Sequence, residues 1–291
     1  MKRLILFFLF AALLPACAVE LSSDATVVNS DGVLVVSAEK PRGVAFNASP
    51  VERGQAYLLT FEAKATGQPL IENNPRAHVA RYENSRLFWR WRFEFHNAEH
   101  QSCGQIGYSH MTVFSSAWRT YKDVFYASED AGSVTLAFFP PGVPVALEMR
   151  NVKLEPYDRG GVVNVNGDFA LGEACLAGWG SPLDGGDFRT VDGKYVYDTA
   201  YGSESARFPL DDRLAYRLTV KRTTYGGYAA ANIYLHGGET RLKMFAVPKS
   251  GTIDFAVPAG TTSGYFKIYN SYLESAILIP LGPKEMLKGD R

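Results

Sequence analysis

An internal repeat of short alternating segments constrains this 291-residue sequence most. Tyr57–Ala65 (YLLTFEAKA) has a counterpart in Tyr216–Arg222 (YRLTVKR), and both alternate apolar with polar residues. Val145–Glu155 and Ser275–Pro280 close the two halves with a further strand-like run. A period of two residues is typical of strands with one buried face. The repeat therefore predicts two β-sandwiches of about 130 residues each, a usual domain size.

The N-terminus predicts export. Lys2-Arg3 precede the apolar run Leu4–Leu14, which is too short to span a bilayer comfortably. Two cleavage sites compete: Ala16–Ala18 fits ordinary signal peptidase, and Leu14–Cys17 resembles a bacterial lipobox in which Cys17 is acylated. Residues 1–18 are thus interpreted as a signal peptide. We expect an extracytoplasmic protein, either secreted or lipid-anchored to the cell envelope.

Composition excludes some partners and favours an all-β fold. Thirty acidic residues balance thirty basic ones, which gives no indication of a general nucleic-acid binder. The 27 Gly and 15 Pro suit strands joined by turns. An oxidising compartment would allow Cys103 and Cys175 to pair, but two isolated thiols fit the sequence equally well.

The organisation is predicted as a first sandwich over residues 20–157 and a second over 162–285. A polar linker, Asp158–Gly161, is expected to bend and to make few contacts. The predicted strands are Val33–Ser37, Val44–Ala48, Tyr57–Ala65, His78–Tyr82, Phe88–His96, Thr120–Tyr126, Val134–Phe139, Val145–Glu155, Tyr195–Asp198, Ser205–Pro209, Ala215–Arg222, Tyr228–His236, Leu242–Val247, Thr252–Val257, Gly264–Asn270 and Ala276–Pro280.

Phe88–His96 and Tyr228–His236 carry the candidate binding residues. Their apolar sets, which include Trp89 and Trp91, are assigned to the core because strand side chains alternate between faces. Sugar recognition combines aromatic rings with fixed hydrogen-bonding groups. Ordinary solvated sheet faces remain the alternative. The candidate ligand residues on the opposite faces are Arg90, Arg92, Glu94, His96, Tyr228, Asn232, Tyr234 and His236, which Tyr265, Lys267 and Tyr269 could extend.

A family resemblance begins at Asn164–Phe169 (NVNGDF), followed by Gly178-Trp179 and a Y-x-L strand. This pattern resembles the carbohydrate-binding modules of families four and nine, which are galactose-binding-like jelly rolls. Asn151–Glu155 is similar to their closing strand. The resemblance implies facing antiparallel sheets and a ligand on the concave face or on edge loops. It also implies a structural calcium ion, with Asn166, Asp168 and Asp187 as candidates, although these residue types serve equally in turns.

Two patterns in the sequence could indicate a hydrolase, and a third could indicate a metal site in a loop. His96–His100 matches H-x-x-E-H, a zinc-peptidase motif that requires a helix, whereas His96 ends a strand pattern. A loop metal site from His96, His100, Cys103 and His110 needs no helix. Glu62, Glu72, Glu94 and Glu148 could form a glycosidase pair if their separation allowed it.

Together these patterns predict an exported, non-catalytic protein with two tandem jelly-roll sandwiches. Its expected partner is a polysaccharide or glycan, with no nucleic acid, and with the membrane reached only through lipid on Cys17. Two weak sites on one chain would combine by avidity on a polymer. The alternative is a structural, assembly or adhesion protein of the cell envelope that has no sugar site.

Overall fold

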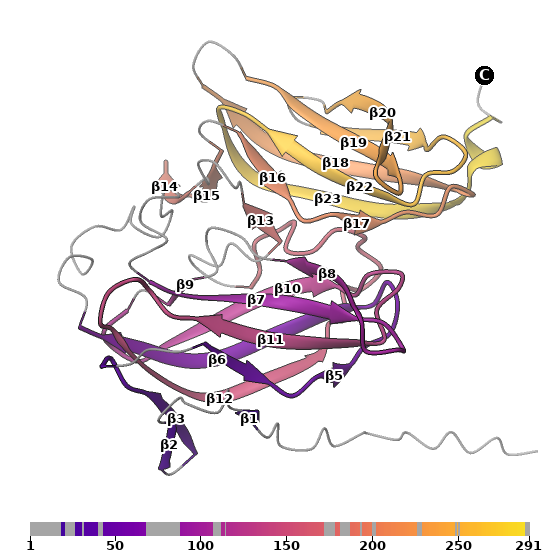
Figure 1. Cartoon of the computed structure of the whole chain (residues 1–291). Helices are drawn as coiled ribbons and strands as arrows, with labels where there is room; N and C mark the ends of the chain where they lie inside the picture. Colours follow the sequence, from indigo (N-terminus) through magenta and orange to yellow (C-terminus); the bar gives the residue numbers. More distant parts are fainter. Residues whose placement is uncertain are drawn as a thin grey trace, which may run out of the picture.

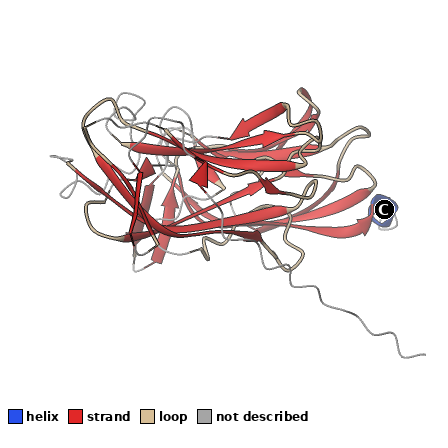
Figure 2. Ribbon diagram, turned by 60° about the horizontal axis from the view of Figure 1, so that its bottom comes forward, coloured by secondary structure: helices blue, strands red, loops and turns tan. Residues whose placement is uncertain are grey.

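The protein is all-β, as its sequence predicts. The computed structural model describes residues 19–20, 27–30, 32–39, 43–67, 88–106, 112–113, 115–171, 178–180, 187–192, 194–199, 202–225, 229–247, 249 and 251–288. Strands dominate this part of the chain (Figure 2), and its helical element is the short 3-10 helix η3 (Lys284–Lys288). None of its helices has the length and apolar character needed to cross a membrane. Cys17, Glu72, the strand predicted at 78–82, His110, Cys175 and Tyr228 lie outside the described residues.

The first half forms two antiparallel sheets, which face each other. The β7 sheet has the order β1-β4-β11-β7-β8, and β5 and β9 pair with β11 and β7. Its strands are β1 (Val19–Glu20), β4 (Val44–Phe46), β5 (Ser49–Pro50), β7 (Trp89–His96), β8 (Ser102–Ile106), β9 (Thr112–Val113) and β11 (Ser133–Phe139). The β6 sheet, in the order β10-β6-β12-β3-β2, consists of β2 (Val27–Ser30), β3 (Val33–Val36), β6 (Ala56–Thr66), β10 (Arg119–Tyr126) and β12 (Ala146–Pro156).

The second half also forms two antiparallel sheets. The β19 sheet has the order β13-β16-β22-β19-β20, and β17 pairs with β22. Its strands are β13 (Trp179–Gly180), β16 (Ser203–Ser205), β17 (Phe208–Pro209), β19 (Ala231–Gly237), β20 (Thr240–Ala246) and β22 (Ser263–Ile268). The β18 sheet, in the order β14-β15-β23-β18-β21, consists of β14 (Asp187–Val191), β15 (Lys194–Asp198), β18 (Leu214–Thr224), β21 (Gly251–Ala256) and β23 (Ser271–Pro283).

The pairing order is the same in both halves. β7 lies between β8 and β11, just as β19 lies between β20 and β22. The registers agree as well: His96 pairs with Ser133 and His236 with Ser263, and a register shift lies beside each histidine. His96 of β7 and His236 of β19 therefore occupy corresponding positions in the two halves. The domain limits 20–157 and 162–285 stay predictions.

Most predicted strands are present with ends shifted by a few residues. The predicted strand Ser205–Pro209 is instead two strands, β16 and β17, which both pair with β22. The sequence did not indicate β8, because SCGQI has no alternating apolar residues and its residues are largely exposed at a sheet edge. Pairing with β7 accounts for its conformation instead.

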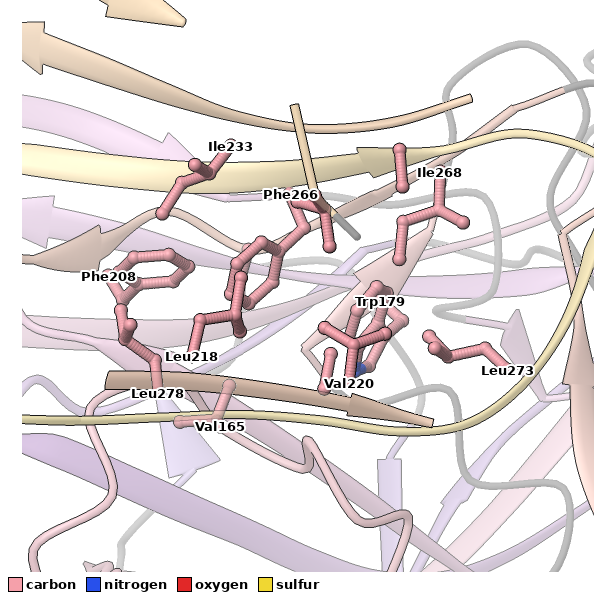
Figure 3. Packing of buried hydrophobic residues seen from close by; sticks show 14 of the residues in the cluster. Val165, Trp179, Phe208, Leu218, Val220, Ile233, Phe266, Ile268, Leu273 and Leu278 are labelled. Carbon is pink, nitrogen blue, oxygen red and sulfur yellow. The ribbon is translucent and has the colours of Figure 1, made fainter. Parts of the chain in front are cut away.

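Each half has its own hydrophobic cluster between its two sheets. In the first half, Phe61 of β6 contacts Trp91 of β7 edge to face, with ring centroids 5.1 Å apart. In the second half, Trp179 stacks on Phe266 with centroids 6.1 Å apart. Figure 3 shows Trp179 and Phe266 among aliphatic side chains of the same cluster, including Leu218 and Leu278. Burial of large apolar side chains on the inner faces is what holds such paired sheets together.

The two halves are also packed against each other. Ala56, Val124 and Tyr126 of the first half belong to the hydrophobic cluster of the second. Figure 1 shows β8 and β10 on the side of the first half that faces β17. The expectation of a linker with few contacts is wrong: Arg159 donates to the Tyr126 hydroxyl and the Val163 carbonyl, and its guanidinium lies over the Tyr126 ring. Arg159 thus connects the linker to both halves, while Asp158, Gly160 and Gly161 are exposed.

Candidate functional site

The outer face of the β7 sheet carries the first group of predicted ligand residues. The alternation of β7 is as predicted: Trp89, Trp91, Phe93 and Phe95 are at most 4% exposed and lie in the core. Arg90, Arg92, Glu94 and His96 point to the other face, where Arg90 is exposed and the others are half-buried. This separation follows from the pleat, which sends successive side chains to opposite sides.

The polar residues of this first face are largely paired with one another. Arg92 Nε donates to Glu94 Oε1 at 2.5 Å, and its guanidinium lies 4.1 Å from the ring centroid of Phe139. His96 Nε2 lies 3.2 Å from Thr135 Oγ1. The structure thus brings Arg92, Glu94 and His96 together on one surface, supported from the neighbouring strand β11. A ligand here would meet a fixed ion pair and the exposed Arg90.

The outer face of the β19 sheet carries a more aromatic group. Tyr234 of β19 stacks on Tyr265 of β22, directly opposite in the ladder, with ring centroids 5.0 Å apart and planes 9° apart. Asn232 lies opposite Lys267, whose ammonium donates to Glu204 Oε1 of β16 at 2.6 Å. This face therefore combines two phenol rings, an amide and an ion pair. Tyr228, predicted to belong here, lies outside the described residues.

His236 is only 7% exposed, so its side chain is not accessible to a ligand on this face. Its ring lies 5.6 Å from that of Tyr265, and neither ring nitrogen has a hydrogen-bond partner. Burial lowers the pKa of His236, and the charges of Arg207 and Arg241 lower it further, while Glu239 acts in the opposite direction. The imidazole is therefore held neutral beneath Tyr265, although a buried imidazole normally finds a partner.

Two further pKa shifts keep the face in a defined ionisation state. The hydrogen bond from Lys267 to Glu204 raises the pKa of the ammonium, so Lys267 stays charged. Burial raises the pKa of the Tyr265 phenol, which consequently stays protonated and able to donate. The face thus presents donors in fixed positions across the neutral pH range.

Glu204 and Met244 belong to this face but were not predicted. Glu204 pairs with Lys267 across the β16–β22 ladder, and Met244, 49% exposed, lies opposite Tyr234 on β20. Their side chains join the face only through pairing between strands that are distant in sequence. The sole sequence signal was the alternation of β22, which placed Tyr265 and Lys267 on a common side.

In the described part of the chain, the predicted metal ligands accept hydrogen bonds from backbone N–H groups. Asn166 is 4% exposed and has a φ of 48°. Its backbone carbonyl accepts a hydrogen bond from the Trp179 indole at 3.0 Å, and its side-chain Oδ1 accepts one from Leu171 N at 3.4 Å. Asp168 accepts from Ala170 N at 3.1 Å. Asp187 lies in β14, whose side chains are not described. These contacts are those of turn residues, and the calcium assignment stays a prediction.

The H-x-x-E-H motif does not assemble into a metal site within the described residues. His96 ends β7, and the rest of the H-x-x-E-H string forms a turn in which Asn97 Oδ1 accepts from Glu99 N and Gln101 N. Over the described ranges, no three His, Cys, Asp or Glu side chains gather closely enough to hold a metal ion. Cys103 is a free thiol that packs against the first hydrophobic cluster.

No protein-family model and no curated protein sequence matches the chain. Among solved structures, it is similar to a tandem of two family 22 carbohydrate-binding modules from Paenibacillus barcinonensis, at 11% identity over 93% of this chain and 100% of that one, with a TM-score of 0.28. It is also similar to an N-terminal cellulose-binding domain from Cellulomonas fimi, at 17% identity over 46% of this chain and 84% of that one, with a TM-score of 0.30.

A further similarity is to the enzymatically active domain of a tailspike protein of bacteriophage CBA120. The identity is 16%, the TM-score is 0.30, and the match covers 48% of this chain. The chain spans 18% of that tailspike domain. Carbohydrate-binding modules are thus among the structures similar to this protein, but scores of this size identify neither a ligand nor a reaction.

Proposed function

We propose that this is an exported, non-catalytic carbohydrate-binding protein that contacts a glycan through the outer faces of its β7 and β19 sheets. We further propose that its two pairs of sheets are tandem galactose-binding-like jelly rolls, which the repeated pairing order supports. One observation carries the binding proposal: the Tyr234–Tyr265 stack lies beside the Glu204–Lys267 pair on a single sheet face.

This combination matches the chemistry of a sugar ring. A pyranose has C–H faces that pack on aromatic rings and hydroxyls that need donors and acceptors in fixed directions. Tyr234 and Tyr265 supply rings and phenol hydroxyls, while Asn232 supplies an amide. Because sheet strands hold these groups rigidly, little entropy is lost on binding.

The described carboxylates support a binding role more than a catalytic one. A glycosidase needs a carboxylic acid whose pKa is raised towards neutrality. Arg150 donates to Glu62 at 2.6 Å and lowers the pKa of that carboxyl. Lys64 lies 2.9 Å from Glu148, and Glu94 is bonded to Arg92. Each of these three carboxylates is thus paired with a cation.

Export and calcium belong to the proposal as well. Residues 1–18 would direct the chain out of the cytoplasm, with or without acylation of Cys17. A calcium ion held by Asn166, Asp168 and Asp187 would stabilise the start of the second half, because oxygen ligands suit this ion.

A glycan array and pull-downs on insoluble polysaccharides would test binding by the mature protein, residues 19–291, with calcium and with EDTA. We expect binding to a defined glycan, weakened about fivefold or more by Tyr234→Ala, since a packed aromatic ring contributes on the order of 1 kcal/mol or more. Arg92→Ala should also weaken binding, because the proposal includes the first face; unchanged binding in this variant would contradict the role of that face.

Tyr272→Ala is the matched control. Tyr272 packs against Tyr225 with ring centroids 4.4 Å apart and planes tilted by 32°, but it belongs to the β18 sheet and not to the proposed face. Its removal should leave glycan affinity unchanged. Absence of binding by a folded sample, or equal losses in both tyrosine variants, would contradict the proposed function.

A further inference from the structure

A cavity of about 530 Å³ lies between the two halves of the chain. The first half lines it with residues 104–106 of β8 and with 124–129, where β10 ends. The second half contributes residues 204–209, Glu239 and Tyr265. β8, β10 and β17 can be followed to this region in Figure 1. The volume falls within the range of about 300–1,000 Å³ typical of small-molecule sites.

The cavity is continuous with both candidate faces. Tyr265 lines the cavity and also stacks on Tyr234, and Glu204 lines it while bonding Lys267. On the other side, Gln105 lines the cavity and lies opposite Glu94 in the β7–β8 ladder. Residues directly opposite in a ladder point to the same side of the sheet. The cavity therefore joins the β19 face to the edge of the β7 face.

The lining has both apolar and unsatisfied polar groups. Ile106, Pro209 and Tyr265, none of which is fully buried, provide apolar surface. Ser128 Oγ is buried without a hydrogen-bond partner, and Arg207 reaches Glu239 only at 3.6 Å. A ligand that carries hydroxyls on a C–H framework would accept hydrogen bonds from the exposed guanidinium of Arg207 while its C–H groups cover these apolar side chains.

The charges around the cavity favour a neutral ligand. Among the described residues, the carboxylates of Glu129, Glu204 and Glu239 line it, together with the guanidinium of Arg207. Glu204 and Lys267 neutralise each other, so an excess of one negative charge remains. An acidic saccharide would meet an excess of like charge here, which disfavours its binding.

The cavity has a fixed shape because its walls are joined through a common core. Val124 and Tyr126, which line it from the first half, belong to the hydrophobic cluster of the second half. They are 1% and 8% exposed. A site between such walls is preorganised and does not have to be assembled by the ligand.

We propose that the cavity and the two sheet faces form one composite site, which binds a single neutral oligosaccharide per chain. The oligosaccharide runs from Tyr234 past Tyr265 into the cavity and towards Gln105. This inference rests on the proposed function and specifies its ligand. It replaces the prediction of two weak sites that combine by avidity, because the faces are parts of one rigid surface.

Titration calorimetry of the mature protein with neutral cello-, xylo- and galacto-oligosaccharides, from disaccharide to hexasaccharide, tests the composite site. We expect affinity to rise with length and one hexasaccharide to bind per chain. Gln105→Trp, which fills the cavity from the exposed β8 edge, should weaken hexasaccharide binding about tenfold or more and leave disaccharide binding unchanged. Arg207→Ala, from the opposite wall, should have the same selective effect.

Gln101→Trp is the matched control, because Gln101 is exposed and lies in the turn before β8, outside the cavity lining. Two hexasaccharides per chain, or unchanged hexasaccharide affinity in both cavity variants, would overturn the composite site and leave the proposed function intact. Failure of every oligosaccharide to bind the folded wild-type protein would contradict the composite site, and the proposed function as well where the glycan array also shows no binding.

Discussion

At the residue scale, Asn164 joins the start of the second half to its last strand. Its side-chain Nδ2 donates to the Ala276 carbonyl at 2.7 Å, and its Oδ1 accepts from Leu278 N at 2.8 Å. Asn164→Ala would leave two buried backbone groups unpaired, at about 1–3 kcal/mol each. We expect urea denaturation to show that the free energy of unfolding falls by at least about 2 kcal/mol. The free energy of unfolding of Asn47→Ala, at an exposed position, should stay within about 0.5 kcal/mol of the wild-type value. Equal losses in the two variants would contradict the role of Asn164.

His236 gives a second prediction at the residue scale, in its pH dependence. Its pKa is lowered on folding, mainly by burial, so the unfolded chain binds a proton more readily. The contribution of neutral His236 to stability is therefore complete above the unfolded pKa of about 6.5 and is lost as pH falls below it. His236→Phe keeps an apolar ring under Tyr265 and cannot titrate. We expect melting temperatures of this variant to fall less than those of the wild type between about pH 7 and pH 5.

The same substitution separates stability from function. Because both nitrogens of His236 lack partners, His236→Phe should unfold at an equal or higher temperature near neutral pH. Buried unsatisfied groups persist at functional sites despite their cost. If the variant keeps full glycan affinity, His236 has no part in binding; if it shows the wild-type pH profile, the assignment of the titration to His236 is wrong.

At the scale of single elements, strand faces could be predicted from the sequence and contacts between strands could not. The alternation of β7 placed Trp89 and Trp91 in the core, because a single strand determines which of its side chains share a face. The stack of Tyr234 on Tyr265 depends on the register between β19 and β22, which are distant in sequence. The burial of His236 has the same origin, since Tyr265 covers it at a register shift. The cavity could not be predicted from the sequence, because its lining comes from both halves and depends on how they pack against each other.

At the scale of the whole molecule, the shared hydrophobic cluster predicts that the two halves unfold together. Val124 and Tyr126 pack into the second cluster, and across the same boundary Lys122 Nζ donates to the Leu171 carbonyl at 3.3 Å. Opening one half would therefore expose apolar surface of the other. Leu147 and Leu278 are fully buried in the first and second clusters respectively, which makes them a matched pair for testing this coupling.

Leu147→Ala and Leu278→Ala should each destabilise their own cluster by about 2–5 kcal/mol. If the halves form one cooperative unit, each variant should lower the hydrogen-exchange protection of both β6 and β18 by the same free energy. Mass spectrometry of peptides from the two strands, under conditions where global opening dominates exchange, measures both at once. Were Leu147→Ala to leave β18 fully protected, the halves would open independently. The composite site would then lack the rigid walls from which its preorganisation was argued.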